Sequence, residues 1–310
     1  MMQNELIKTL AAEVGFDLCG VVAATHFASH EERFRRWIAD HKQASLGYLE
    51  RNIEKRFDAR LLVEGARSII VCAVNYKNAI SRGYPEGHRA KIASYGCNTD
   101  YHTTIKQQLR ALQERLAAHY PTLRARGFVD SAPLAEKTLG VAAGLGWIGR
   151  NSLLITPQYG SFIHLGELVV SEECDRYDTP FEGDHCGNCH ICRDHCPTAA
   201  IGDERTIDAR RCIACHTIEA QPNERVALDG WIFGCDACQH HCPHNQRTPD
   251  HQNSAFEPLF DPRAITPRQW LDEGEEGFAK RCSTTPIMRA GWERIERLLT
   301  EDFATHTNEE

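Results

Sequence analysis

Long hydrophobic runs are missing from the 310-residue sequence, and their absence limits where the protein works. No uninterrupted apolar stretch reaches the roughly 18 residues that a membrane-spanning helix requires. The opening MMQNELIKTL lacks the apolar core of a secretory leader, and no twin-arginine leader is present. We therefore expect a cytoplasmic protein that does not cross a membrane.

Positive charge is not in excess either, because the formal net charge is −8 at pH 7. This balance excludes a protein coated in basic residues for non-specific nucleic-acid binding, although it leaves room for a local basic patch. Each basic strip is typical of a solvated face, and each is also a candidate contact for an anionic partner. The strips lie at residues 51–60, 87–91, 123–127 and 203–211.

Low-complexity tracts and long-period repeats are absent, so the elements follow from hydrophobic periodicity. An i, i+3, i+4 pattern predicts a helix over 100–119 that Asp100 starts. Further helices are predicted over 1–14 and over 131–144, the latter capped by Ser131. Short apolar runs predict strands at residues 67–76, 127–130, 152–156 and 161–170. Because strands and helices alternate, we expect an α/β domain in this part of the chain.

Cysteine is the residue in excess, with fourteen in the chain and nine of them between Cys186 and Cys242. A reducing compartment disfavours structural disulfides, so this clustering favours metal or redox chemistry. Two runs carry it, and Cys212 and Cys215 lie between them. The runs are Cys186-x2-Cys189-x2-Cys192-x3-Cys196-Pro197 and Cys235-x2-Cys238-x3-Cys242-Pro243. Zinc usually takes two separated pairs, which these spacings do not provide.

The spacing instead matches the bacterial ferredoxin pattern, in which the fourth cysteine of a run ligates the other cluster. It therefore predicts two [4Fe–4S] clusters. The first takes Cys186, Cys189, Cys192 and Cys242. The second takes Cys196, Cys235, Cys238 and one further cysteine, either Cys212 or Cys215, of which we favour Cys212. Since a long α/β segment precedes this module, we expect the clusters to feed a redox centre held there.

Two other features leave alternatives open. GLGWIG at 144–149 has the G-x-G-x-x-G form, but a predicted helix precedes it and a predicted strand follows, so we do not expect nicotinamide binding. Its glycines indicate a tight backbone path that lets a large flat ligand approach the main chain. Asp130 ends a predicted strand just before a predicted helix, where an acid either caps the helix or takes part in chemistry.

Several motifs together resemble those of epoxyqueuosine reductase, the QueG family, over roughly residues 45–295. They are VDSAPLAEKTLGVAAGLGWIGRNSLLI (129–155), YGSFIHLGEL (159–168), the first cysteine run, DARRCIACHTIE (208–219) and GWIFGCDACQHHCPHN (230–245), with weaker agreement at 55–76 and 100–102. The resemblance implies a cobalamin-binding α/β (α+β) catalytic domain at 1–173, related in fold to reductive dehalogenases. A ferredoxin-like domain with two [4Fe–4S] clusters would follow at 174–250, and a helical segment at 251–310.

The resemblance also implies a reaction, the last step of queuosine biosynthesis. The epoxide of epoxyqueuosine at the wobble position of a tRNA is reduced to queuosine, with electrons passing through the clusters to cobalamin. A carboxylic acid must protonate the departing oxygen, and the family motif places this proton donor at Asp130. The implied cobalamin contacts are Arg56, Cys97, Asp130, Asn151, Ser152 and Asp236. The cobalamin signature D-x-H-x-x-G is absent, because Ile105 stands in its last position, so no histidine is expected below the cobalt.

The implied partner is a tRNA with a GUN anticodon, for Asp, Asn, His or Tyr, together with an electron donor that the sequence does not identify. The basic strips at 51–60 and 205–211 are the candidate phosphate contacts, and we expect a monomer. Two other classes share the same cysteine pattern. One is a cobalamin-dependent dehalogenase that acts on a small molecule, and the other is a non-enzymatic electron carrier, which needs neither cobalamin nor Asp130.

Overall fold

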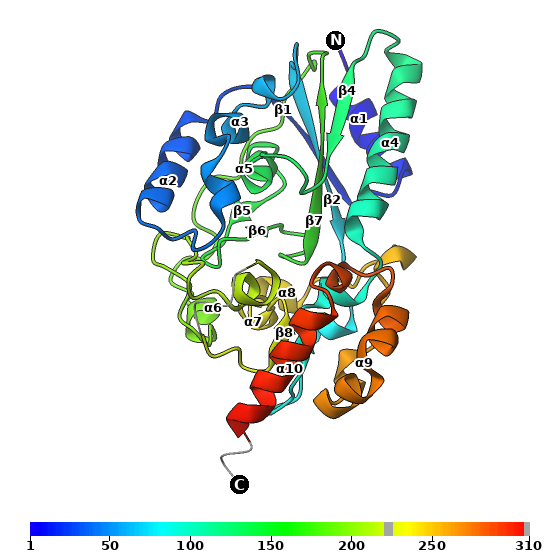
Figure 1. The fold of residues 1–310 in the computed structure, drawn as a ribbon. Coiled ribbons are helices and arrows are strands. Elements are labelled where there is room, and N and C mark those ends of the chain that lie inside the picture. The colour runs from blue at the N-terminus through cyan, green and yellow to red at the C-terminus, as the bar shows by residue number, and fades with distance from the viewer. Residues whose placement is uncertain (220–225, 307–310) are drawn as a thin grey trace.

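An antiparallel four-stranded sheet lies at the centre of the first half of the molecule (Figure 1). The computed structural model describes residues 1–219 and 226–306. The strands are, in spatial order, β1 (Leu18–Ala23), β2 (Ser68–Asn75), β7 (Ile163–Val170) and β4 (Ala125–Phe128). All residues of β2 are buried because the sheet is covered on both faces, which explains why this strand reads as a continuous apolar run.

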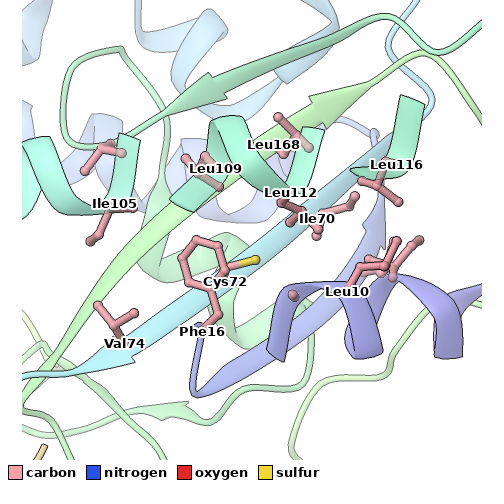
Figure 2. Close-up of a cluster of buried hydrophobic side chains, with 14 of the residues drawn as sticks. Leu10, Phe16, Ile70, Cys72, Val74, Ile105, Leu109, Leu112, Leu116 and Leu168 are labelled. Carbon is pink, nitrogen blue, oxygen red and sulfur yellow. The ribbon is translucent and has the colours of Figure 1, made fainter. Parts of the chain in front are cut away.

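Helices α1 (Asn4–Glu13) and α4 (Tyr101–His119) cover one face of the sheet, as Figure 2 shows. The predicted periodicity of α4 is confirmed, because its leucine and isoleucine side chains at i, i+4, i+7 and i+11 pack on β2 and β7. Asp100 begins the helix as expected, since its carboxylate accepts the N–H of His102. The side chains that form this layer include Leu10, Phe16, Ile70, Cys72, Val74, Ile105, Leu109, Leu112, Leu116 and Leu168.

Helix α5 (Glu136–Ala142) covers the opposite face of the sheet, with α2 (Ala28–Ala39) and α3 (Ile53–Phe57) beside it (Figure 1). The predicted start of this helix near residue 131 is wrong. Its N-cap position is Ala135, which makes no side-chain cap, so Ser131 does not cap it. The reason is that residues 131–135 are needed for a loop that carries Leu134 into the apolar layer beneath α5.

A small hairpin follows α5 and consists of β5 (Trp147–Ile148) and β6 (Leu154–Ile155). In the structure, GLGWIG follows the helix α5 and leads into the hairpin, as the sequence predicted. A dinucleotide-binding fingerprint has the opposite order, with a strand before it and a helix after it. A Cβ atom at Gly146 would lie 2.0 Å from the carbonyl oxygen of Ile155. The close approach at this glycine is thus made by the partner strand of the hairpin.

The second half of the molecule contains short strands, short helices and two longer C-terminal helices around a second core (Figure 1). Strand β3 (Lys91–Ile92) pairs in parallel with β8 (Trp231–Phe233), although the two are far apart in sequence. The helices here are α6 (Ile191–Asp194), α7 (Ala237–His240), α8 (Pro243–Gln246), α9 (Pro267–Cys282) and α10 (Trp292–His306). Residues 79–97 thus belong to the first predicted domain by position and to the second half by packing.

The short single turns complete the description and include one π-helical turn, η5 (Cys215–Glu219). The others are η1 (Gly47–Glu50), η2 (Ala59–Leu61), η3 (Ala79–Arg82), η4 (Ser94–Cys97), η6 (Ser254–Phe256), η7 (Pro262–Ala264) and η8 (Pro286–Arg289). Within residues 1–219 and 226–306, no helix combines the length and the apolar character that crossing a bilayer requires.

Candidate functional site

The cysteines of the second half gather in two sets. Burial raises the pKa of the Cys242 thiol to about 11, and repulsion from its neighbours Cys186, Cys192 and Cys189 adds to this rise. Cys186 and Cys242 also pack against the same apolar group, which includes Trp147. The last cysteine of the second run therefore lies among the first three cysteines of the first run, which is the neighbourhood that the exchange of ligands between runs requires.

The second set joins Cys196 to Cys212, Cys235 and Cys238. Burial raises the pKa of Cys235, and the nearby charges of Asp236, Cys212 and Cys196 raise it further. The pKa of Cys238 is raised in the same way, first by burial and then by repulsion from Cys235 and Cys212. Thiols so close together resist ionisation while they lack a cation, and binding of iron would displace their protons.

Cys215 has different surroundings from Cys212. It packs in a small apolar group with Ala209, next to Trp37 and Leu46 of the first half. Cys212 lies at the edge of the same group, and its thiol interacts electrostatically with Cys196, Cys235 and Cys238. This arrangement favours Cys212 as the fourth thiol of the second set. In the described residues, no three Cys, His, Asp or Glu side chains converge on a single metal ion.

Two residues connect the second thiol set to the first half. The Asn151 side chain is buried, and its Nδ2 donates to the carbonyl oxygen of Cys238 at 3.5 Å. The Lys137 Nζ donates to the carbonyl oxygen of Ser152 at 2.7 Å, and its charge interacts with the thiols of Cys238 and Cys212. The start of α5 and the loop before β6 therefore lie against the second thiol set.

Asp130 lies in the loop between β4 and α5, where its φ of 44° is in the left-handed region. Aspartate tolerates this region better than most residues. The Asp130 side chain is 64% exposed, and its Oδ2 accepts the hydroxyl of Tyr101 at 2.8 Å. Because α5 begins six residues later, Asp130 does not cap it, and the helix-cap alternative is wrong.

Two further carboxyl groups lie near Asp130. Glu136, the first residue of α5, accepts the backbone N–H of Asp130 with its Oε1 at 2.7 Å. Burial raises the pKa of Glu136 to about 7, and repulsion from Asp130 contributes. Glu167 of β7 is 0% exposed, neither of its carboxyl oxygens has a hydrogen-bond partner among the described residues, and burial raises its pKa well above the usual range. Repulsion from Glu136 and Asp130 adds to this rise in the pKa of Glu167.

Aromatic and basic side chains complete this part of the site. The ring of His164 stacks on Tyr101 with centroids 4.0 Å apart and planes 7° apart, and burial lowers the pKa of this histidine to about 3. His102 lies 3.9 Å from Asp130 through its Nε2, which accepts from Arg289 at 3.0 Å, while its Nδ1 bonds Asp100 at 2.8 Å. Arg289 thereby ties the C-terminal segment to the site.

A cavity of about 420 Å³ opens beside these groups and lies within the usual size range of ligand sites. One part of its wall is apolar and includes Phe34 and Trp37. The polar part includes Arg56, Glu136, Lys137 and Ser152 from the first half and Arg205 from the cysteine region. The cavity therefore lies where the two halves meet.

The predicted cobalamin contacts fall into two groups. Arg56, Ser152 and Asn151 lie at or beside the cavity, and the Nε of Arg56 is buried without a hydrogen-bond partner among the described residues. Cys97 is fully buried in the core that includes Phe233. Asp236 is buried as well, and it accepts from the backbone and hydroxyl of Ser94 and from Gln239. The roles assigned to all of these residues stay predictions.

The residues of the site fit the implied cofactors on their own chemistry. Two groups of four soft thiols suit two iron–sulfur clusters. An apolar wall next to an unpaired buried guanidinium N–H and an ammonium suits a large flat ring with polar amide arms. Arg56, Ser152 and Asn151 are the residues that would hold such a ring.

Sequence reasoning missed several residues of the site. It did not assign roles to Glu136, Glu167, Lys137 or Tyr101, and it did not connect Arg289 to the site. Only Glu167 has a clear signal in the sequence, because a glutamate stands among buried residues in the strand IHLGELVV, whose only other ionisable residue is His164. Glu136 reads as an ordinary acid in a first helical turn, and Arg289 is 189 residues away from Asp100, which it bonds.

The fold and the site define an iron–sulfur oxidoreductase with a carboxylic acid at a cavity between its two halves. Two family models match the chain. "Epoxyqueuosine reductase QueG, DUF1730" matches residues 56–131, and "4Fe-4S double cluster binding domain" matches residues 185–245. The epoxyqueuosine reductase of Cellulophaga algicola is 36% identical over 302 residues, which cover 95% of this chain and 96% of that protein. The enzyme of Pseudomonas aeruginosa is 35% identical over 94% of this chain and 82% of its own. The chain therefore belongs to the epoxyqueuosine reductase (QueG) family.

Solved structures agree with this assignment. An epoxyqueuosine reductase bound to an epoxyqueuosine-modified tRNA-Tyr stem loop matches with a TM-score of 0.83 and 27% identity, covering 95% of this chain and 79% of that one. The Bacillus subtilis enzyme also gives a TM-score of 0.83, at 26% identity and with the same coverage. A catabolic reductive dehalogenase matches at 0.50 and 14% identity, over 97% of this chain and 36% of that one, which shows a shared fold. The match to the double-cluster model supports two [4Fe–4S] clusters as cofactors.

Proposed function

We propose that the chain reduces the epoxide of epoxyqueuosine at the wobble position of tRNA to the alkene of queuosine. Membership of the family supports this activity. The observation that carries it in the structure is the meeting of two kinds of chemistry at one cavity. Glu136 and Lys137 both line the cavity. Glu136 accepts the backbone N–H of the acid Asp130, and the charge of Lys137 interacts with Cys212 and Cys238 of the second thiol set. Cobalamin, reduced through the two clusters, would supply two electrons when bound.

The residues of this chain would position the substrate oxygen and supply its proton. Asp130 is held by Tyr101 on its side chain and by Glu136 on its backbone, so its carboxyl group has a defined place at the site. A proton donor so positioned typically contributes a factor of about 10² to 10⁴ in rate. Arg56, Ser152 and Asn151 would hold cobalamin, and the thiol sets given above would hold the clusters, with Cys212 in the second set. Cys97 and Asp236 stay in the proposal as cobalamin contacts on the resemblance alone.

The proposed substrate is a tRNA with a GUN anticodon, for Asp, Asn, His or Tyr, and the reaction is placed in the cytoplasm. A loop base can be turned out of its stack into a protein pocket. Two of the four basic strips support this role, because 51–60 and 203–211 contribute Arg56 and Arg205 to the cavity wall. The other two strips have local partners. Lys91 pairs with Asp229, and Arg126 lies over the ring of Phe128. We propose a monomer that receives electrons from an external donor.

A reconstitution assay tests the proposal. The protein is loaded anaerobically with iron, sulfide and cobalamin, and a chemical reductant and an epoxyqueuosine-bearing tRNA-Tyr stem loop are added. Mass spectrometry of the digested nucleosides then measures the product. Loss of one oxygen mass from the modified base is the expected result. A fully loaded protein that leaves the base unchanged, but removes halogen from a halogenated phenol, would instead establish the dehalogenase alternative.

A further inference from the structure

Removal of an epoxide oxygen needs more protons than one acid can deliver. Both C–O bonds break, a C=C bond forms, two electrons enter and the oxygen leaves as water, so two protons must reach the same oxygen. Asp130 can give one of them and is then a carboxylate. Before the second C–O bond breaks, Asp130 must be protonated again or another acid must act. This requirement rests on the proposed function.

We propose that Glu136 is the residue that returns a proton to Asp130 between the two protonations of the departing oxygen, with Glu167 behind it as a further proton store. The geometry supports this role. Glu136 touches the Asp130 residue directly, because its Oε1 is 2.7 Å from the Asp130 backbone nitrogen. Its side chain also lines the cavity. Glu136 therefore lies beside the acid and at the cavity, and it is close enough to Glu167 to raise the pKa of that residue.

Glu136 and Glu167 can hold protons near neutral pH. Burial, followed by repulsion from Asp130, raises the pKa of Glu136 to about 7, although Lys137 and Arg56 act in the opposite direction. Glu167 is fully buried on the face of β7 that lies under α5, and its two oxygens lack hydrogen-bond partners among the described residues. A carboxylate in that place would be costly, so the neutral acid is favoured.

The other titratable groups near Asp130 are less suited to this task. His102 has its Nε2 occupied by the guanidinium N–H of Arg289, so that nitrogen accepts and has no proton to give to Asp130. Burial lowers the pKa of His164 to about 3, so its ring is neutral. Burial together with Asp130 raises the pKa of Tyr101, which already donates its hydroxyl to Asp130. Among these groups, Glu136 is the one that both touches the Asp130 residue and exchanges a proton near pH 7.

Two substitutions at one position separate proton return from simple support of the loop. Glu136→Gln keeps the length of the side chain and an oxygen that accepts the Asp130 N–H, but it cannot carry a proton. Glu136→Asp keeps a carboxylic acid but is one methylene shorter, so it loses the hydrogen bond. Glu64→Gln, at an exposed position in the loop before β2, controls for the loss of a negative charge. The assay is single-turnover reduction of the tRNA stem loop from about pH 5 to about pH 9, under fully reducing conditions.

Proton return predicts that Glu136→Gln slows turnover by at least about 10-fold at pH 7. Glu136→Asp should retain more activity than Glu136→Gln, and Glu64→Gln should match the unmodified protein. A Glu136→Gln protein within about twofold of the unmodified one would overturn the proposal and show that solvent reprotonates Asp130. Because each comparison starts from an active unmodified protein, failure of that protein would count against the proposed function instead.

Infrared difference spectroscopy gives a readout that is independent of turnover. The carbonyl band of a protonated carboxylic acid is followed in the iron-loaded protein, without cobalamin or tRNA, over the same pH range. A band that titrates near pH 7 and is missing from Glu136→Gln is the expected result. If the two proteins give the same titrating bands, Glu136 holds no proton near neutrality and the proposal fails, even if the variant is too unstable for assay.

Discussion

The two halves of the molecule owe their structures to different forces. In the sheet half, long helices and long strands bury contiguous apolar side chains, and Ile70, Leu112 and Leu168 are completely inaccessible to solvent. In the cysteine region, helices α6, α7 and α8 have four residues each, too few to be stable on their own. The comparison indicates that burial of apolar side chains alone can stabilise the sheet half, whereas ligation of iron must contribute to the folding of the cysteine region, residues 186–219 and 226–245.

The largest effect that separates the halves should come from removing a thiol of the second set. Cys238→Ala should abolish turnover, lower the iron content to about half and weaken the amide protection of residues 186–219 and 226–245 by at least about 100-fold. Protection of β2 and β7 should stay within about threefold, because their hydrogen bonds and apolar contacts are untouched. Hydrogen exchange with mass spectrometry measures both regions in one sample. Equal loss of protection in both would show that the halves fold as one unit.

Substitution of the two intervening cysteines sharpens the same comparison. Cys212→Ser should lower the iron content to about half, because this thiol lies among Cys196, Cys235 and Cys238. Cys215→Ser should leave the iron content unchanged, because that residue packs with Ala209 in an apolar group. Iron analysis and electron paramagnetic resonance of the reduced proteins distinguish them. The reverse outcome would show that Cys215, and not Cys212, is the fourth ligand of the second cluster.

A smaller effect is expected in the core of the sheet half. Leu112→Ala should lower the free energy of unfolding by about 2 to 5 kcal/mol, because it leaves a cavity between α4 and the sheet. Glu114→Ala, on the exposed side of the same helix, should change it by less than about 0.5 kcal/mol. Denaturant unfolding followed by circular dichroism measures both, and iron content should be unaffected. If Leu112→Ala also loses iron, the stabilities of the two halves are coupled, which would contradict the comparison.

The smallest effect concerns pH. Folding raises the pKa of Glu136 from 4.5 to about 7, so the folded state binds this proton more tightly than the unfolded state. Stability is therefore lost as the pH rises from about 4.5 to about 7. Glu136→Gln removes this loss and should be more stable than the unmodified protein at pH 8, by about 1 to 3 kcal/mol, with little difference at pH 4. Thermal unfolding at the two pH values tests this, and a gain confined to pH 4 would contradict it.

Much of the secondary structure of the sheet half could be predicted, because the sequence pattern within each element indicates its type. The continuous apolar run of β2 and the spacing of leucines in α4 each follow from contacts that their own residues make. Two features could not be predicted, because they depend on residues far away in the sequence or on packing of the folded chain. The antiparallel order β1-β2-β7-β4 depends on connections across the whole half, and the late start of α5 depends on the loop that positions Leu134.

The two cysteine sets could be predicted from spacing because ligands of a cluster are constrained by geometry, and the structure brings the same cysteines into neighbourhood. The carboxyl groups around Asp130 could not. The raised pKa values of Glu136 and Glu167 arise from burial in the folded protein and from nearby carboxyl groups, and Arg289 reaches the site through tertiary packing. The division into 1–173, 174–250 and 251–310 also stays a prediction, because residues 79–97 pack with the second half.

The central claim is that the cysteine region supplies electrons while the sheet half supplies protons, and a single-turnover experiment with Asp130→Asn tests it most directly. The fully loaded variant is reduced, the spectrum of its cobalamin is recorded, and the epoxyqueuosine tRNA stem loop is then added. We predict that the cobalamin is reduced as in the unmodified protein, while formation of queuosine falls by about 10² to 10⁴-fold. Unchanged formation of queuosine, or a failure to reduce the cobalamin, would contradict the account.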